Sequence, residues 1–130
     1  MRLLLDTTVL IDALRGRPAA ERLRALRDSA SEAPWICAIN VEEIVRGALA
    51  SEQDAIERFL AGMRMAPLGR PEGALAGRWR RQFAREGVTL SQADCLIAAA
   101  AVGVGARLAS GNPKHFPMSE LEIEHWPVGS

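Results

Sequence analysis

Oxygen-bearing side chains follow several of the short apolar runs in this chain. Asp6 comes directly after "RLLL", Glu43 lies a few residues after "PWICAI", and Asp94 stands just ahead of a long uncharged run. Ser110 and Asn112 follow a further short run, "ARLA". Carboxylate, hydroxyl and amide oxygens, with no cysteine or histidine among them, are the ligands that Mg²⁺ and Mn²⁺ prefer. If these side chains meet in the fold, they predict a divalent-metal site.

A group of carboxylates at one point also predicts a type of reaction. The like charges repel one another, so either a bound cation or a raised carboxyl pKa must resolve the conflict. A divalent ion lowers the pKa of a bound water, orients a phosphodiester and stabilises the charge that develops on the leaving oxygen. The residue types therefore favour metal-assisted hydrolysis of a phosphodiester, with one or two ions.

Each acid also has a purely structural explanation. Asp94 lies three residues after Ser91, and Glu43 lies three residues after Asn40, and both spacings resemble a capping box at a helix start. Asp6 could likewise cap the helix that follows it. The two explanations are compatible, because a carboxylate in the first turn of a helix can still face a metal ion.

The elements that must position these residues form an alternating pattern. Strands are predicted for residues 2–5, 34–39, 64–68, 106–110 and 121–126, and helices for residues 7–16, 18–30, 40–50, 51–63, 71–87 and 91–105. Such an alternation predicts an α/β protein with a mostly parallel central sheet flanked by helices. Ligands of these sheets collect beyond the carboxyl ends of the strands, so the polar residues after each apolar run are expected to converge.

Several polar residues predict how individual helices begin. We expect Thr7 or Thr8 to cap the first helix, Asn40 to cap the helix after the second strand, and Ser51 to open the next one. Asp12, within the first helix, is expected to lie on the helix surface or to pair with an arginine. These expectations rest on local preferences alone.

Composition and length indicate one ordinary globular domain, residues 1–130. The chain is 48% hydrophobic and 25% charged, with a formal net charge of zero, so neither disorder nor a strongly basic protein is indicated. Cys37 and Cys95 lack any metal-ligand spacing and predict buried free thiols in a reducing compartment. The longest uncharged run is about half of the roughly 20 residues that span a bilayer. We therefore expect a cytoplasmic protein with no membrane partner.

Three segments resemble a known family. "LLLDTTVLIDALRG" resembles the opening of the PIN-domain ribonucleases, especially the VapC-type toxins of bacterial type II toxin–antitoxin systems. "CAINVEEIVRGA" is similar to the second block of that family, and "LSQADCLIAAAAVGVGARLASGNPKHF" is similar to its third and fourth blocks in order and spacing. The resemblance covers nearly the whole chain. It implies a PIN-like α/β/α sandwich of three layers.

The resemblance also implies roles for individual residues. It places the catalytic and metal-binding acids of the family, which hold one or two Mg²⁺ or Mn²⁺ ions, on three positions: Asp6, Glu43 and Asp94. Asn112 stands where the family often has an acid, so its amide would contribute to the metal site through water. Thr8 and Ser110 occupy supporting positions.

Substrate and partners follow from the resemblance as well. It implies an RNA substrate, a cognate antitoxin that neutralises the toxin, a homodimer, and contact with DNA only through the antitoxin complex. Because carboxylates repel a nucleic acid, a basic rim is needed, and the candidates are Arg15, Arg17, Arg78 and Arg81. The arginines between residues 78 and 85 could instead form the solvated face of a helix. We expect His115 and His125 on the surface or in strands.

Two other functions compete with a ribonuclease. A PIN-fold module that only binds partners is the first, and Asn112 supports it because a neutral amide replaces a metal-binding charge. A phosphatase of the haloacid dehalogenase type is the second, since "LDTTV" loosely resembles its opening motif. Such a phosphatase needs a second aspartate where this chain has Thr8, which counts against it.

Overall fold

A parallel five-stranded sheet forms the centre of the molecule in the computed structural model, which describes residues 2–29 and 32–129. The strand order is β3-β2-β1-β4-β5, and every neighbouring pair is parallel. The strands are β1 (Leu3–Leu5), β2 (Trp35–Ile36), β3 (Arg64–Met65), β4 (Arg107–Ser110) and β5 (Ile123–His125). The predicted α/β class with a parallel sheet is confirmed.

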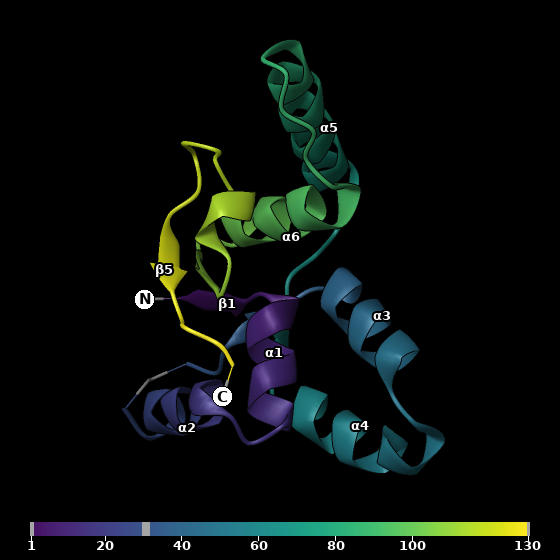
Figure 1. The fold of residues 1–130 in the computed structure, drawn as a ribbon, viewed down its shortest axis with the longest axis vertical. Coiled ribbons are helices and arrows are strands. Elements are labelled where there is room, and N and C mark those ends of the chain that lie inside the picture. Colours follow the sequence, from purple (N-terminus) through teal and green to yellow (C-terminus); the bar gives the residue numbers. More distant parts are fainter. Residues whose placement is uncertain (1, 30–31, 130) are drawn as a thin grey trace.

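Helices connect the strands and cover both faces of the sheet (Figure 1). They are α1 (Thr7–Leu14), α2 (Pro18–Ser29), α3 (Ala38–Gly47), α4 (Gln53–Ala61), α5 (Arg70–Arg85) and α6 (Gln92–Gly103), with short 3₁₀ turns η1 (Ala50–Glu52) and η2 (Pro113–His115). Figure 1 shows α5 projecting from the body of the molecule beyond α6, on which it packs.

Two hydrophobic clusters hold the three layers together. Side chains of a strand alternate between the two faces of a sheet, and Leu4 of β1 accordingly joins the cluster beneath α5 and α6, whereas Leu3 and Leu5 join the cluster with α1, α2 and α4. The uncharged run ahead of which Asp94 stands supplies fully buried alanines to the first cluster. The α/β/α sandwich is therefore built as the sequence predicts.

The register of the central strands brings their carboxyl ends to one edge. Leu5 of β1 pairs with Ala109 of β4, and the backbone N–H of Asp6 donates to the carbonyl of Ala109 at 2.9 Å. On the other side of β1, Leu4 pairs with Trp35 of β2. The residues that follow β1, β2 and β4 consequently lie beside one another, where α1, α3 and the turn after β4 begin.

Three predicted helix caps differ from the observed ones. The N-cap of α1 is Asp6, whose carboxylate accepts from the backbone N–H of Thr7, so neither threonine caps this helix and the alternative that Asp6 does so is confirmed. Helix α3 begins after Cys37, which leaves Asn40 inside the first turn. The 3₁₀ turn ahead of α4 follows Leu49, so Ser51 is not the cap. Asp6 is a residue that local preference favours as a cap, whereas α3 and the 3₁₀ turn begin after Cys37 and Leu49, which have no such preference.

Asp12 is the residue whose predicted position is most clearly wrong. Its side chain is only 3% exposed and makes no ion pair with any residue that the structure describes. Instead, its two carboxylate oxygens accept hydrogen bonds from the backbone N–H groups of Ala19 and Gly129, each at 2.9 Å. A buried carboxylate needs such donors, and Asp12 therefore ties α1 to the start of α2 and to the end of the chain.

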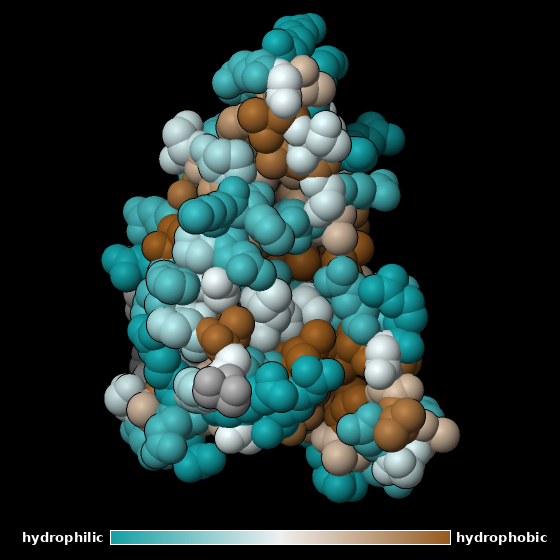
Figure 2. All heavy atoms as spheres, in the orientation of Figure 1, coloured by the Kyte–Doolittle hydropathy of each residue, from teal (hydrophilic) through white to brown (hydrophobic). Residues whose placement is uncertain are grey.

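The surface is largely polar, with apolar side chains exposed in a few places. Figure 2 shows polar side chains over most of this view, with apolar groups gathered over α3 and α4. None of the helices in the described part of the chain is long and apolar enough to cross a bilayer. Both cysteines are buried free thiols, as predicted.

Candidate active site

Asp6 is held at the end of β1 by three neighbouring residues. The side chain is 4% exposed. Its Oδ1 atom accepts from the backbone N–H of Thr7 at 2.8 Å, and its Oδ2 atom accepts from the hydroxyls of Thr8 at 3.1 Å and Ser110 at 2.8 Å. Because Ser110 comes from the end of β4, this carboxylate joins two neighbouring strands. Its position and orientation are therefore fixed before any ligand arrives.

Burial raises the pKa of the Asp6 carboxyl above its usual value of 3.8. The hydrogen bonds from Ser110, Thr8 and Thr7 oppose this shift of the pKa, and the nearby charge of Asp94 adds to it. A carboxylate that loses its hydration is costly unless a cation replaces the water. No arginine, lysine or histidine of the described residues forms an ion pair with Asp6.

A chain of hydrogen bonds between α1 and α3 orients the side chain of Glu43. The hydroxyl of Thr7 donates to Oε1 of Glu43 at 2.7 Å and accepts from the amide Nδ2 of Asn40 at 3.0 Å. The carbonyl oxygen of the Asn40 amide accepts from the backbone N–H of Cys37 at 2.8 Å. Asn40 is fully buried. Asn40 is therefore not the N-cap of α3 but supports it from the third position of the helix, and its amide also positions Thr7. Thr7 and Asn40 were missed as residues that orient an acid.

Asp94 lies in the first turn of α6, beside its cap. The hydroxyl of Ser91 accepts from the backbone N–H of Asp94 at 3.0 Å, so the predicted cap is confirmed. The carboxylate is free of that cap and is about one quarter exposed, with Oδ2 at 3.6 Å from Nδ1 of His115. Its backbone is consequently fixed by the buried helix while its side chain points outward.

Asn112 belongs to a short turn that wraps around the Asp6 carboxylate. The backbone N–H of Asn112 donates to the hydroxyl of Ser110 at 2.9 Å, and the backbone N–H of Gly111 donates to the hydroxyl of Thr8 at 3.3 Å. Both hydroxyls in turn donate to Oδ2 of Asp6. The turn, the hydroxyls and the carboxylate form one network.

The acids surround one open pocket of about 340 Å³ at the carboxyl end of the sheet. Its lining comes from α1, α3, α6 and the turn after β4: Asp6, Thr7, Thr8, Ile11, Glu43, Arg46, Asp94, Asn112 and His115. The predicted acids and Asn112 therefore lie together, and Ser110 stands just beneath them. Two larger pockets, of about 510 and 350 Å³, lie elsewhere in the described part of the chain, but neither is lined by more than two acids.

The basic residues near this pocket differ from the predicted rim. Arg15 and Arg17 line a neighbouring pocket of about 250 Å³ that shares Thr8 and Ile11 with the acidic one. Arg78 and Arg81 are exposed on α5 and line neither pocket.

The acidic pocket itself contains Arg46 and His115, which sequence reasoning left out of the rim. His115 was expected on the surface or in a strand, and it is indeed exposed, but η2 places it against Asp94. The helical spacing of Arg46, three residues after Glu43, could have identified it, because residues three apart share a helix face.

Comparison with known proteins identifies the family. Residues 3–117 match the PIN domain family. This chain belongs to the PIN-domain family. Two ribonucleases of Mycobacterium tuberculosis also resemble this PIN domain: VapC19 is 33% identical over 88% of this chain and 92% of its own length, and VapC10 is 34% identical over 91% and 88%. The haloacid dehalogenase alternative is therefore wrong.

Solved structures share the fold of this PIN domain. One is VapBC2 from Rickettsia felis, determined as a complex with a DNA fragment from its promoter. It matches with a TM-score of 0.81 and 23% identity, over 97% of this chain and 99% of the other. At this level of identity the match establishes the three-layer fold, while the residues of the site must be judged from their own geometry.

The donor atoms of this PIN domain fit Mg²⁺ or Mn²⁺ bound partly through water. Within the described ranges, no three acids, histidines or cysteines stand close enough to form a closed cage. Mg²⁺ does not need such a cage, since it keeps several waters and usually takes one or two carboxylates together with substrate phosphates. Asp6, Glu43 and Asp94 offer hard oxygens on an open pocket, and buried Asp6 has no cation beside it. The arrangement suits an ion that arrives hydrated.

The cysteines take no part in this chemistry. Cys37 and Cys95 are fully buried and line none of the acidic pocket. Burial raises the pKa of the Cys95 thiol to about 11 and also raises the pKa of Cys37. Since the thiolate is the reactive form, both thiols are inert at neutral pH.

Proposed function

We propose that this PIN domain is a metal-dependent endoribonuclease that acts as the toxin of a toxin–antitoxin pair. The observation that carries the proposal is the convergence of Asp6, Glu43 and Asp94 on one open pocket at the carboxyl end of the sheet. The likeness to ribonucleases VapC19 and VapC10 supports the choice of RNA as substrate. All described residues belong to one sheet and its flanking layers, which supports a single domain.

The chain's own residues divide the work of such a site. Asp6 supplies a fixed carboxylate whose second oxygen is oriented by Thr8 and Ser110. Glu43 is steered by the Thr7 hydroxyl, and Asp94 is carried by a buried helix. A bound Mg²⁺ or Mn²⁺ supplies a water of lowered pKa and compensates charge on the phosphate.

Asn112 affects the proposed metal site differently from an acid at the same position. Its amide is neutral, so it can orient water through its carbonyl oxygen without adding to the repulsion among the three acids. We infer that Asn112, which stands where the family often has an acid, weakens the second of two possible ion positions and leaves the first intact. The number of ions bound per chain, measured with Mn²⁺ for the wild type and Asn112→Asp, tests this inference.

Binding of RNA needs positive groups around the acids. Arg46 and His115 line the acidic pocket, and Arg15 and Arg17 line the pocket next to it. Arg46 is available because the one ion pair it forms among the described residues, with Glu42 at 3.8 Å, joins two exposed side chains and contributes little. Arg78 and Arg81 lie on α5 and would contact only a longer RNA.

Incubation of the purified protein with single-stranded and structured RNA, with and without Mg²⁺ or Mn²⁺, tests the activity. We expect cleavage that chelation with EDTA abolishes and that Asp94→Asn reduces strongly. A folded protein that binds RNA but never cleaves it would favour the alternative, a PIN-fold module that only binds partners. Equal cleavage by the wild type and Asp94→Asn would refute the site.

The toxin role requires a partner that neutralises it. We propose that a cognate antitoxin covers the acidic pocket and itself contacts DNA. This chain would then meet DNA only through the complex. The DNA-bound VapBC2 complex of Rickettsia felis supports this view. A toxin acting on cellular RNA works in the cytoplasm, where buried free thiols persist. Co-expression with the neighbouring open reading frame should yield a stable complex with no ribonuclease activity.

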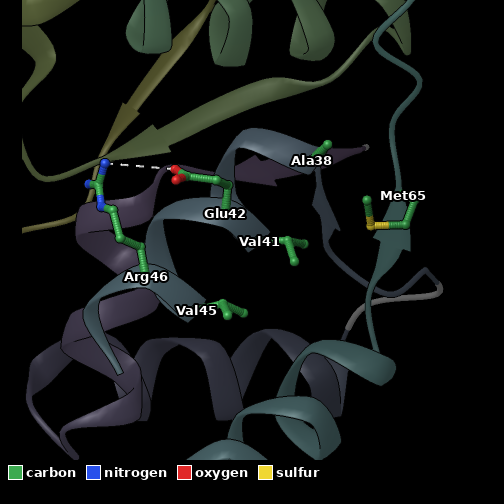
Figure 3. Close-up of a pocket in the computed structure, with 6 residues that line it drawn as sticks. All are labelled: Ala38, Val41, Glu42, Val45, Arg46 and Met65. Carbon is green, nitrogen blue, oxygen red and sulfur yellow. Dashed lines mark ion pairs between the residues drawn. The ribbon is translucent and has the colours of Figure 1, made fainter. Parts of the chain in front are cut away.

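A second copy of the chain is the partner proposed for the apolar face of α3. Val41, Val45 and Met65 point into a pocket of about 510 Å³ between α3 and the edge strand β3 (Figure 3). Val45 and Met65 are each about half exposed. The pair of Glu42 and Arg46 at its rim is self-complementary, since a two-fold axis would let each arginine reach the glutamate of the other copy.

The oligomeric state tests this pairing. We expect a dimer by light scattering and a monomer for Val45→Glu, because a buried charge opposes association. Val88→Glu, at another exposed valine, is the matched control and should leave the dimer unchanged. A wild-type protein that is monomeric at high concentration would refute the homodimer.

A further inference from the structure

The end of the chain returns from β5 to the start of α1, beside the acidic pocket. We call residues 126–129 the C-terminal strap; in Figure 1 its course runs from β5 past α1. Trp126 is 2% exposed, and its backbone N–H donates to the carbonyl of Ser110 at 2.9 Å. The guanidinium of Arg22 lies 4.8 Å from the centre of the Trp126 ring. The strap is therefore attached both to the sheet and to α2.

Val128 of the strap lies directly on Gly111 of the turn around Asp6. A Cβ atom placed on Gly111 would stand 2.7 Å and 2.9 Å from the two γ-carbons of Val128 and 3.3 Å from its Cβ. Rotation of the valine cannot remove this contact. Two methyl groups share three staggered positions, so at least one of the two close positions is always filled. No residue larger than glycine fits here unless the strap or the turn moves.

Backbone conformation does not explain the glycine at this position. Gly111 is absent from the residues with positive φ, whereas Gly129 in the strap has φ of 104°. The need for glycine at position 111 therefore comes from the contact with Val128 alone. An alanine at this position would act on the strap and the turn and would not strain its own backbone.

The far end of the strap is fixed by the buried carboxylate of Asp12. Its Oδ1 atom accepts from the backbone N–H of Gly129 at 2.9 Å, while its Oδ2 atom accepts from Ala19 at the start of α2. Asp12 and Asp6 belong to the same short helix, one within it and one as its cap. The contacts therefore close a ring from Asp6 through the turn at Gly111, the strap and Asp12 back to Asp6.

The ring includes residues beyond 3–117, the range that matches the PIN domain family. The match to the PIN domain ends at residue 117, before the strap begins. Val128 and Gly129 of the strap line the pocket of about 250 Å³ beside the acidic pocket, together with Thr8 and Ile11. The support of the turn that carries Asn112 is thus supplied by a segment that the family pattern does not describe.

We propose that the C-terminal strap is a positioning element of the acidic site, with Val128 as its positioning residue. Val128 presses on Gly111 and thereby holds Ser110 and Asn112 against Asp6, and Asp12 holds the strap in place. The consequence for catalysis rests on the proposed function, whereas the effect on the turn does not. Loss of the Val128–Gly111 contact loosens the turn while the sheet stays intact.

Four variants test the strap: Gly111→Ala, Val128→Ala, the double variant, and Gly77→Ala as the matched control. Gly77 lies in α5 with no other atoms within 4 Å of an added Cβ. In metal-free protein we expect Gly111→Ala to speed amide exchange at residues 111 and 112. It should also lower kcat on RNA by about tenfold, the lower end for changes around metal ligands, with little change in KM. The double variant should recover both, because removing the valine methyls makes room for the alanine.

Each outcome decides the proposal. Unchanged exchange at residues 111 and 112 in folded Gly111→Ala overturns it, and so does a double variant as impaired as the single one. If Gly111→Ala does not fold, Val128→Ala decides alone: faster exchange at the turn with an unchanged melting temperature supports the strap, and unchanged exchange refutes it. A wild type that cleaves no RNA refutes the proposed function, while the exchange measurements still judge the strap.

Discussion

The starts of α1 and α6 each bring a carboxylate to the acidic pocket, and they do so differently. The N-terminus of a helix favours negative charge through its free N–H groups and its dipole. Asp6 is itself the cap of α1, so its side chain serves the helix and the pocket together. At α6 the work is divided, because Ser91 caps the helix and leaves the side chain of Asp94 free.

The surroundings of the two acids differ as much as their roles. Asp6 is almost fully buried and receives hydrogen bonds from Thr7, Thr8 and Ser110. Asp94 is about one quarter exposed; among the described residues its carboxylate forms an ion pair with His115 alone, and its charge lies near Asp6. One acid is thus held rigidly, and the other can adjust to an arriving ion and phosphate. A site that opens to a large substrate benefits from both kinds of ligand.

Replacement of either acid should produce the largest effect. We expect Asp6→Asn and Asp94→Asn to lower kcat by about a hundredfold or more. Changes to residues that only hydrogen-bond to a metal ligand already cost about 10- to 100-fold. The measurement is single-turnover cleavage of RNA at saturating Mn²⁺. Asp54→Asn, an exposed acid on α4, is the control. If only one of the two variants loses activity, the two helix starts do not contribute to the same site.

Removal of the α6 cap should produce a smaller effect that is mainly structural. Ser91→Ala leaves the N–H of Asp94 without its side-chain acceptor and should cost about 1 kcal/mol of unfolding free energy. Urea denaturation measures this loss. Because the cap sets the first turn that aims Asp94, kcat should fall by severalfold in the same variant. A stability loss with fully normal kcat would show that Asp94 needs no help from its cap.

The smallest effect concerns the cost of burying Asp6. Burial raises the pKa of this carboxyl, so the folded state holds its proton more tightly than the unfolded state. Stability of the metal-free protein should therefore fall as the pH rises from the ordinary aspartate pKa of 3.8 toward the folded value, and the loss is complete above it. Asp6→Asn should abolish this loss. The free energy of unfolding of the variant, relative to that of the wild type, should therefore be higher at neutral pH than near pH 4.

Urea denaturation at several pH values compares Asp6→Asn with the wild type. Asp28→Asn, at an exposed position of α2, controls for the substitution itself. A deficit of Asp6→Asn that is equal at every pH would mean that the hydrogen bonds of the carboxylate cancel its desolvation, and a deficit that grows with pH would mean that they outweigh it. The same comparison with Mn²⁺ present should reverse in favour of the wild type, because an ion that binds the folded state stabilises it.

Local patterns were sufficient to predict the sheet and the acids. Short apolar runs such as "RLLL" and "ARLA" can only be strands, and the alternation with helices requires parallel neighbours. Once the strands are parallel, Asp6 and Ser110 must share an edge of the sheet, although they lie far apart in the chain. The convergence of these side chains follows from topology and needs no knowledge of individual contacts.

Tertiary contacts decided what the sequence did not reveal. Asn40 has the side chain of a helix cap, but the end of β2 places Cys37 at that position and turns Asn40 toward Thr7. Asp12 looks like a surface residue of an isolated helix, and only the returning strap supplies the donor that buries it. Likewise, the position of His115 depends on how the turn after β4 folds back. Such outcomes depend on segments more than 20 residues away, beyond the reach of helix and strand periodicity.

The distance along the chain between Asp6 and Ser110 also sets when the site can exist. The two residues are 104 positions apart, and β1 can pair with β4 only after residues 107–110 have been synthesised. At about 5 to 20 residues per second, a ribosome carries Asp6 for about 5 to 20 s before it adds Ser110. During this time the acids that have been synthesised are not yet assembled into a site. If the protein cleaves RNA, the ribosome that makes it is not exposed to a complete site before residue 110 has been added.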